Sequence, residues 1–182
     1  MRIIAGTFKA RRLLTPKDKT VRPTTDRLRE SIFNVLTSRL GTFEGLQVAD
    51  VFAGTGAFGL ECLSRGADGA ILVEKHFESL NLLRQNIALL GVEEKAEILT
   101  ADARNLPRRG GHFDVIFLDP PYGRGLALPT LQSLIASHWI GPATLIVVER
   151  AEKDTFELPD TLEEVKSIKQ GTRRVQFLTV KV

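Results

Sequence analysis

The chain has 182 residues, of which 43% are hydrophobic, 26% are charged and one is a cysteine. This length and composition suit one globular domain with an apolar core, and a single cysteine excludes an internal disulfide. No apolar run approaches the length of a membrane span, and the first residues lack the apolar core of a signal peptide, so we expect a cytoplasmic protein. His76, His112 and His138 stand far apart without ligand spacing, which predicts surface or loop positions and no metal site.

The net charge of +3 is unevenly distributed along the chain. Residues 1–29 carry nine basic and two acidic side chains, whereas the other 153 residues carry 16 basic and 20 acidic ones. A basic end of this kind can simply keep a protein soluble, or it can bind phosphates through counterion release. We favour phosphate binding, because the charges lie on a segment with a strand pattern.

Two elements are expected before residue 45. Residues 2–5 and 11–14 are short apolar runs on either side of a turn that contains Gly6, and they predict a small hairpin. A helix follows, because Pro23 bars helix before it, Thr25 can cap it and Gly41 ends it. Its apolar residues recur at helical spacing: Leu28, Ile32, Val35, Leu36 and Leu40.

From residue 46 the pattern alternates between strand and helix. We expect strands at 46–54, 70–74, 96–102, 113–119 and 143–150, and helices at 57–66, 77–90 and about 127–138. The tail reads as two strands that turn at Gly171. The fold class is therefore α/β, a doubly wound, mostly parallel, seven-stranded sheet closed by an antiparallel C-terminal hairpin. Ligands of such sheets bind beyond the carboxyl ends of the strands.

A glycine loop follows the first of these strands. Gly54, Gly56 and Gly59 have G-x-G-x-x-G spacing, which alone also matches a nicotinamide-binding loop. Asp50 lies four residues before Gly54, in an apolar strand where a carboxylate is costly to bury without a partner. S-adenosylmethionine offers that partner, because it carries an ammonium and a sulfonium.

Two further acids end the next two strands. Glu74 suits ribose hydroxyls, and Asp102 can accept a hydrogen bond from an adenine amine. A plainer interpretation is that Asp50 and Asp102 only cap turns.

The strand at 113–119 ends in the sequence Asp119-Pro120-Pro121-Tyr122. An amine conjugated to an aromatic ring is a poor nucleophile, and two acceptors on its N–H groups free its lone pair. The Asp119 carboxylate and the Pro120 carbonyl can be those acceptors, and the prolines hold the carbonyl still. Tyr122 can stack on the ring, an attraction worth about 1–3 kcal/mol. The alternative is an ordinary prolyl turn after a strand.

The glycine loop and the Asp-Pro-Pro-Tyr turn together resemble the amino-methyltransferases of the class I Rossmann-like fold. The stretches "RIIAG", "RPTTDRLRESIFNVL" and "LSRGA" extend the similarity. With them, essentially the whole chain resembles the bacterial small-subunit ribosomal RNA guanine-N2 methyltransferases. Ala10 departs from the pattern, since relatives often carry glycine there.

This resemblance implies methyl transfer from S-adenosylmethionine to the N2 amine of one guanine in 16S rRNA, within an assembled or nearly assembled small subunit. It also implies two parts: residues 1–45 as a basic extension for RNA contact, packed on the core, and residues 46–182 as the methyltransferase domain. We expect a monomer without a metal.

The resemblance assigns residues to three sites. The cofactor set is Thr24, Asp50, Phe52, Ala53, Gly54, Gly56, Glu74, Lys75, Asp102 and Ala103. The base pocket is Asp119, Pro120, Pro121 and Tyr122. The RNA set is Arg2, Lys9, Arg11, Arg12, Arg22, Pro23, Thr24 and Arg27.

Three other functions stay open from the residues alone. A DNA or RNA adenine-N6 methyltransferase would use the same tetrapeptide, and guanine is preferred only through the family resemblance. A nucleic-acid-binding module could keep an inactive methyltransferase fold. A nicotinamide oxidoreductase is disfavoured by Asp50.

Overall fold

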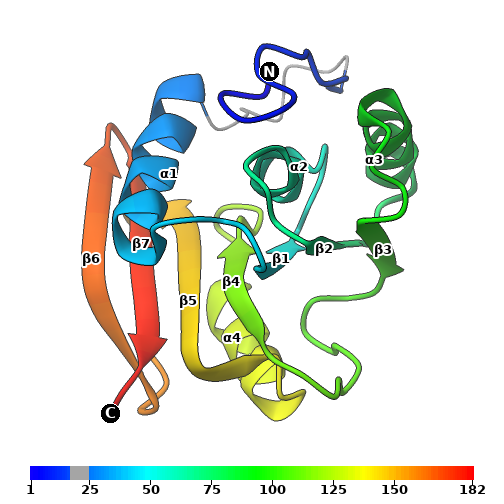
Figure 1. Ribbon diagram of the computed structural model, residues 1–182. Coiled ribbons are helices and arrows are strands. Elements are labelled where there is room, and N and C mark those ends of the chain that lie inside the picture. Colours follow the sequence, from blue (N-terminus) through cyan, green and yellow to red (C-terminus); the bar gives the residue numbers. More distant parts are fainter. Residues whose placement is uncertain (17–24) are drawn as a thin grey trace. The chain divides into compact units, whose positions relative to one another are not determined.

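The computed structural model describes residues 1–16 and 25–182, so the expected roles of Arg22, Pro23 and Thr24 fall outside the described residues. The chain forms two compact units, residues 1–100 and 101–182. Figure 1 labels the helices and strands of both. No helix among the described residues is both long enough and apolar enough to span a membrane.

The described residues of the first unit form three helices and three strands. They are α1 (Asp26–Leu40), β1 (Gln47–Val51), α2 (Ala57–Ser64), β2 (Gly69–Glu74), α3 (Phe77–Leu90) and β3 (Ala96–Thr100). β2 pairs in parallel with both β1 and β3, and α2 packs against β1 and β2. β1 and β2 are buried along nearly all their length, as strands covered on both faces must be.

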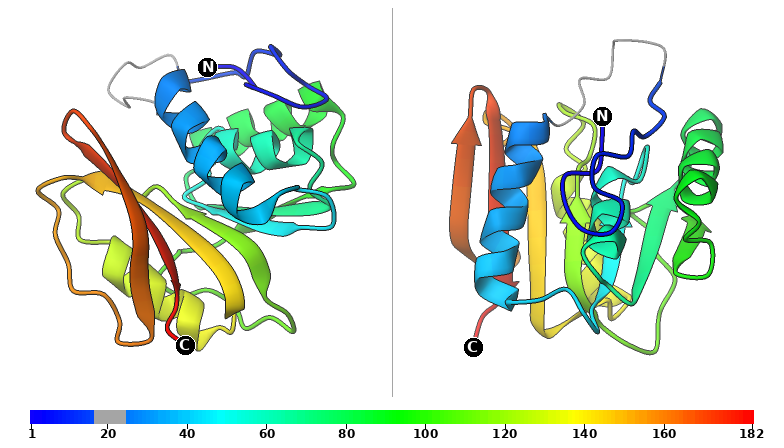
Figure 2. Two further views of the ribbon diagram at one scale, coloured as in Figure 1. Left: turned by 60° about the vertical axis from the view of Figure 1, so that its left-hand side comes forward. Right: turned by 45° about the horizontal axis from the view of Figure 1, so that its top comes forward.

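The second unit contains four strands and one helix. They are β4 (Phe113–Leu118), α4 (Ala127–Ala136), β5 (Ile140–Ala151), β6 (Leu162–Gln170) and β7 (Arg173–Val180). β4 pairs with β5 in parallel, whereas β7 lies antiparallel between β5 and β6 (Figure 2). The last two strands turn at residues 171–172, as the position of Gly171 predicts.

The seven strands form a mixed sheet in the order β3-β2-β1-β4-β5-β7-β6. The mostly parallel sheet with an antiparallel C-terminal hairpin confirms the predicted fold class. β1 ends at Val51, earlier than expected, because Phe52 has a φ of +65° and leaves the extended conformation.

Helix α1 has the ends that the sequence predicts. The Thr25 hydroxyl accepts a hydrogen bond from the Leu28 N–H at 3.2 Å, and Gly41 follows the last turn. Leu28, Ile32 and Leu36 are buried, whereas Val35 and Leu40 are partly exposed. The helix is joined to the core of its unit through an aromatic cluster, in which Phe33 contacts the rings of Phe43 and Phe58.

Residues 1–14, here called the N-terminal arm, form a minimal hairpin. Arg2 and Arg12 make one antiparallel bridge, and the Leu13 N–H donates to the Met1 carbonyl at 3.1 Å. Ile3 and Leu13 are buried beneath it. The expected hairpin is therefore present, but as one bridge rather than two regular strands.

Ala10, in the turn of the arm, has a φ of +68°. This left-handed conformation costs an alanine about 1–2 kcal/mol, and a glycine avoids that cost but loses about 0.5–1 kcal/mol of chain entropy on folding. We therefore predict that Ala10→Gly raises the free energy of unfolding by roughly 0.5–1 kcal/mol, measured by urea denaturation. As a control, the same substitution at Ala88, an exposed helical residue, should lower stability by about 1 kcal/mol. Equal losses for both variants would contradict strain at Ala10.

Candidate functional site

The glycines of the loop from β1 to α2 and of the first turn of α2 serve two different purposes. A Cβ on Gly56 would lie 2.5 Å from a Leu83 methyl, and a Cβ on Gly59 would lie 2.4 Å from a Leu72 methyl. Both positions therefore need glycine for packing against α3 and β2. A Cβ on Gly54 would meet its nearest neighbour, the Phe52 carbonyl oxygen, only at 4.0 Å. The backbone at Gly54 thus has open space beside it, which a ligand can occupy.

Glu74, at the end of β2, holds this glycine loop in place. Its carboxylate accepts hydrogen bonds from the N–H groups of Gly54 at 3.0 Å, Lys75 at 2.7 Å and His76 at 2.9 Å. Glu74 is 7% exposed. A carboxylate has about four acceptor positions, so one remains available for a ligand hydroxyl.

Asp50 is buried in β1 and is only 1% exposed. Its carboxylate accepts a hydrogen bond from the Gly59 N–H at 2.9 Å. Burial, reinforced by the nearby charge of Glu74, raises the pKa of Asp50 to about 7. A cationic ligand would stabilise the charged form, so the residues of this loop fit a cofactor with an ammonium group and hydroxyls.

Asp102 and Ala103 follow β3. The Asp102 carboxylate accepts from the Arg104 guanidinium at 2.7 and 3.0 Å and from the Arg104 N–H at 2.9 Å. Ala103 is buried. Asp102 therefore caps a turn, and an adenine amine would have to share this carboxylate with Arg104.

The Asp-Pro-Pro-Tyr turn begins where β4 ends. Asp119 is partly exposed, Pro120 is buried, and Pro121 and Tyr122 are exposed. The turn thus presents a mixed polar and aromatic surface directly after a buried strand. Such a surface suits a planar ligand with N–H groups at its edge.

Two buried residues on neighbouring strands fix the tyrosine of this turn. The Tyr122 hydroxyl donates to Glu149 on β5 at 2.8 Å, and the Arg173 guanidinium on β7 donates to the same carboxylate oxygen at 3.1 Å. Burial and the charge of Glu149 raise the pKa of Tyr122, so the hydroxyl keeps its proton and remains a donor. Gly123 is held as well, since its N–H donates to Asp154 at 2.7 Å.

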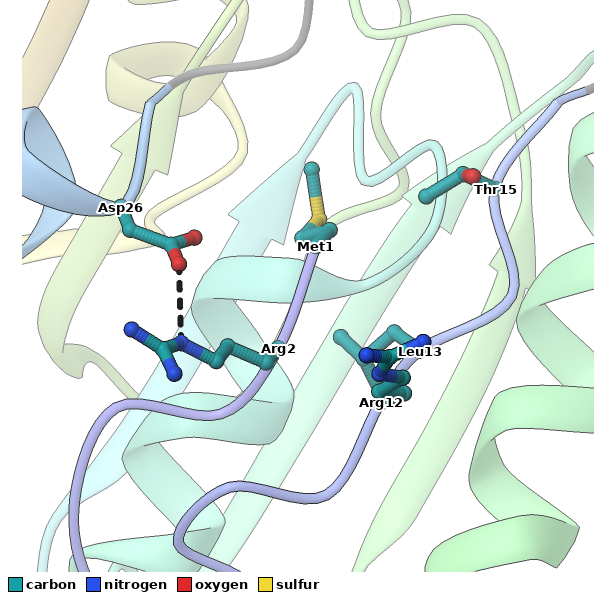
Figure 3. A pocket seen from close by; sticks show the side chains of 6 residues that line it. All are labelled: Met1, Arg2, Arg12, Leu13, Thr15 and Asp26. Carbon is teal, nitrogen blue, oxygen red and sulfur yellow. Dashed lines mark hydrogen bonds and ion pairs between the residues drawn. The ribbon is translucent and has the colours of Figure 1, made fainter.

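Two basic side chains of the arm, Arg2 and Arg12, line a pocket of about 400 Å³ (Figure 3). Arg2 forms an ion pair with Asp26 at 3.0 Å, and Arg12 lies opposite Arg2 across the bridge. Like charges placed opposite each other repel, which a bound anion would relieve. The pocket is lined by Met1, Arg2, Arg12, Leu13, Thr15 and Asp26.

Buried polar groups on α1 and α2 anchor the arm, and these contacts were not predicted from the sequence. Glu61 accepts from the N–H groups of Ile4 at 2.7 Å and Ala5 at 3.0 Å. Ser64 donates to the Ala5 carbonyl at 2.6 Å. Arg29 is fully buried and donates to the Arg2 carbonyl. A lone acid in the apolar helix "AFGLECLS" was the one signal that could have revealed Glu61.

The expected site residues are thus found in three places. The first unit brings Asp50, Phe52, Ala53, Gly54, Gly56, Glu74 and Lys75 together around the ends of β1 and β2. Arg2, Lys9, Arg11 and Arg12 are exposed on the arm and Arg27 is exposed on α1, whereas Asp102, Ala103 and residues 119–122 belong to the second unit. The three histidines are exposed as predicted. Within residues 1–16 and 25–182, no group of three His, Cys, Asp or Glu side chains is arranged to hold a metal ion.

Comparison with known proteins gives the family of this chain. The family model described as conserved hypothetical protein 95 matches residues 1–179. Ribosomal RNA small subunit methyltransferase D of Escherichia coli K12 is 39% identical over 150 residues, which cover 82% of this chain and 74% of the relative. The same-named protein of Haemophilus influenzae is 38% identical over 158 residues, covering 85% and 80%.

The solved structure of the yhhF protein of Escherichia coli has the same fold. It superimposes with a TM-score of 0.86 at 31% identity, and the match covers 100% of this chain and 98% of that one. These similarities confirm the resemblance that the motifs indicated. The chain belongs to the conserved hypothetical protein 95 family, together with ribosomal RNA small subunit methyltransferase D.

Proposed function

We propose that this protein transfers a methyl group from S-adenosylmethionine to the exocyclic N2 amine of one guanine in 16S rRNA. The main support for this proposal is the Asp-Pro-Pro-Tyr turn. Its Tyr122 is held by a hydrogen bond to Glu149, and its Asp119 is partly exposed. The names of the relatives support the small ribosomal subunit as the source of the substrate.

The residues around the glycine loop are proposed to hold the cofactor. The buried Asp50 would bind the ammonium, the backbone at Gly54 and Gly56 would border the methionine part, and Glu74 would offer its remaining acceptor position to a ribose hydroxyl. Asp102 would accept from the adenine amine. The bound cofactor supplies an electrophilic methyl group on its sulfonium. The other proposed members of the set are Thr24, Phe52, Ala53, Lys75 and Ala103.

The acceptor amine is proposed to bind the turn after β4. The Asp119 carboxylate would accept a hydrogen bond from one N–H of the amine, and the Pro120 carbonyl would accept one from the other N–H. These two bonds draw the nitrogen lone pair out of conjugation with the ring. Pro121 keeps this backbone extended, and the Tyr122 ring would stack on the base. Once methylated, the nitrogen is acidic and releases its proton to water, so the site needs no strong base.

RNA recognition is proposed to rest mainly on residues 1–45, with residues 46–182 as the catalytic domain. The exposed cations of the arm and the pocket beside them suit the phosphate backbone. An extension of this size offers little surface for reading sequence, so the folded RNA of an assembled or nearly assembled subunit must present the base through its shape. We further propose that the protein acts as a monomer in the cytoplasm, where ribosomal subunits are found.

The first prediction concerns Asp119. Asp119→Ala should lower the methylation rate by about 10²-fold or more, because one of two acceptors on the amine is lost, while affinity for S-adenosylhomocysteine stays within about twofold. The assay follows labelled methyl transfer to small subunits from a strain that lacks the enzyme, with the modified nucleoside identified by mass spectrometry.

Asp160→Ala is the matched control, since Asp160 is exposed; this variant should keep the parent's rate. Unchanged turnover of Asp119→Ala would remove that carboxylate from the mechanism. Methylated adenine, or activity on naked DNA alone, would overturn the guanine and rRNA assignments.

The second prediction concerns pH. The pKa of Asp50 is about 7, and only the charged carboxylate attracts the cofactor's ammonium. Affinity for S-adenosylhomocysteine should therefore rise about tenfold from pH 6 to pH 8, with proton release on binding below pH 7. Calorimetry in two buffers of different ionisation enthalpy measures both quantities. Asp50→Asn should bind more weakly and without this pH dependence, and an equal pH dependence in both proteins would contradict the role of Asp50.

The third prediction concerns salt. Replacing Arg11 and Arg12 by alanine should weaken binding to the small subunit and reduce the slope of log affinity against log salt by about 1–2. Lys166→Ala provides a control, because Lys166 is exposed on β6, far along the chain from the arm. Filter binding between 50 and about 300 mM salt measures the slopes. Equal slopes for parent and double variant would show that these arginines make no phosphate contact.

A further inference from the structure

Asn86 is a fully buried amide in the middle of α3. Its neighbours on the same helix face, Leu83, Ile87 and Leu90, are apolar and buried. A polar side chain at such a position is unfavourable unless each of its polar atoms has a partner. The hydrogen-bond partners of the Asn86 amide therefore indicate its role.

The amide connects two segments that lie far apart in the sequence. It accepts a hydrogen bond from the Leu14 N–H at 2.7 Å and donates to the Leu14 carbonyl at 3.1 Å. It also donates to the Thr55 carbonyl at 3.0 Å. Leu14 ends the N-terminal arm, and Thr55 lies between the two glycines of the cofactor loop. One side chain thus holds both segments, and both of its amide hydrogens are used.

A second contact joins the same two segments. The Thr55 hydroxyl lies 3.4 Å from the sulfur of Met1 and donates to it. Met1 lines the basic pocket of the arm, and Leu13 and Thr15, the residues on either side of Leu14, line it too (Figure 3). Thr55 is therefore linked to both ends of the arm, directly to Met1 and through Asn86 to Leu14.

We propose that Asn86 is a positioning residue that couples the RNA-binding arm to the cofactor loop. With the arm seated, Asn86 holds the Thr55 carbonyl and keeps the loop in its binding conformation. RNA on the arm and cofactor at the loop then raise each other's affinity by the same factor, as linkage requires. The inference rests on the proposed function, because it takes the loop as the cofactor site and the arm as an RNA contact.

The arm has other anchors, and these separate coupling from simple attachment. Ser64 accepts from the Phe8 N–H at 3.0 Å and donates to the Ala5 carbonyl at 2.6 Å. Neither of these bonds involves residues 54–56. Loss of the Ser64 hydroxyl should therefore loosen the arm at residues 5–8 while Leu14 stays bound to Asn86 and the loop is unaffected, whereas loss of the Asn86 amide should affect both Leu14 and the loop.

The test compares the parent with Asn86→Ala, Asn86→Leu and Ser64→Ala. Asn86→Leu removes the amide without leaving a cavity, and thermal melting shows that each variant is folded. Titration with S-adenosylhomocysteine in the absence of RNA should show a roughly three- to tenfold loss of affinity for both Asn86 variants, the effect of one lost hydrogen bond. Ser64→Ala should bind within about twofold of the parent.

Hydrogen exchange gives a second measurement that does not depend on activity. In Asn86→Ala, exchange should become faster at the Leu14 N–H and also in peptides that contain residues 54–56. In Ser64→Ala it should become faster only in the arm. Unchanged exchange in residues 54–56 of Asn86→Ala would contradict the proposed role.

Adding purified small subunits then tests the coupling itself. They should raise the parent's affinity for S-adenosylhomocysteine, and this gain should shrink in Asn86→Ala. If the parent binds no S-adenosylhomocysteine, the proposed function fails. If the parent binds it, and the Asn86 variants match the parent in affinity and in the gain from subunits, only the coupling is overturned.

Discussion

The Glu74 carboxylate accepts hydrogen bonds from the N–H of Gly54 in the glycine loop and from the N–H groups of Lys75 and His76 after β2, and the position of the glycine loop depends on this interaction. A loop after a parallel strand has few ladder bonds, so a buried acceptor must satisfy its N–H groups. The interaction joins the ends of β1 and β2 and leaves the backbone beside Gly54 open. The loop that is proposed to bind the cofactor is thus held by contacts within the protein itself, and a loop held in this way loses less entropy when a ligand binds.

Buried polar side chains hold backbone segments or loops at other places in the structure as well. Glu61 binds the N–H groups of the arm, Asn86 joins the arm to the loop, and Glu149 holds the tyrosine of the Asp-Pro-Pro-Tyr turn. In each case a buried polar side chain on a regular element fixes an irregular segment. Helices and strands are more rigid than loops and hold such side chains in more exact positions. The loop and turn residues that are proposed to bind ligands are therefore positioned by the sheet and its helices.

The described charges among the first 29 residues differ in their surroundings. Arg29 is buried, and it binds the Arg2 carbonyl and Asp26, so it stabilises the arm rather than contacting a partner. Asp26 also pairs with Arg2. Only part of the local positive charge therefore remains for an anion, and among the described cations Arg12 lines the pocket together with the paired Arg2. A count of charges along the sequence cannot make this distinction, because burial depends on the packing of α1.

The sequence by itself determined the order of helices and strands, the caps of α1 at Thr25 and Gly41, and the two motifs. These features depend on local spacing and on backbone restrictions of single residues. The motifs also sufficed for the family. The tertiary structure alone decided which polar groups meet: Asn86 with Leu14 and Thr55, and Tyr122 with Glu149 and Arg173. These partners lie 24 to 72 residues apart, and no local pattern encodes contacts that form only when distant elements pack.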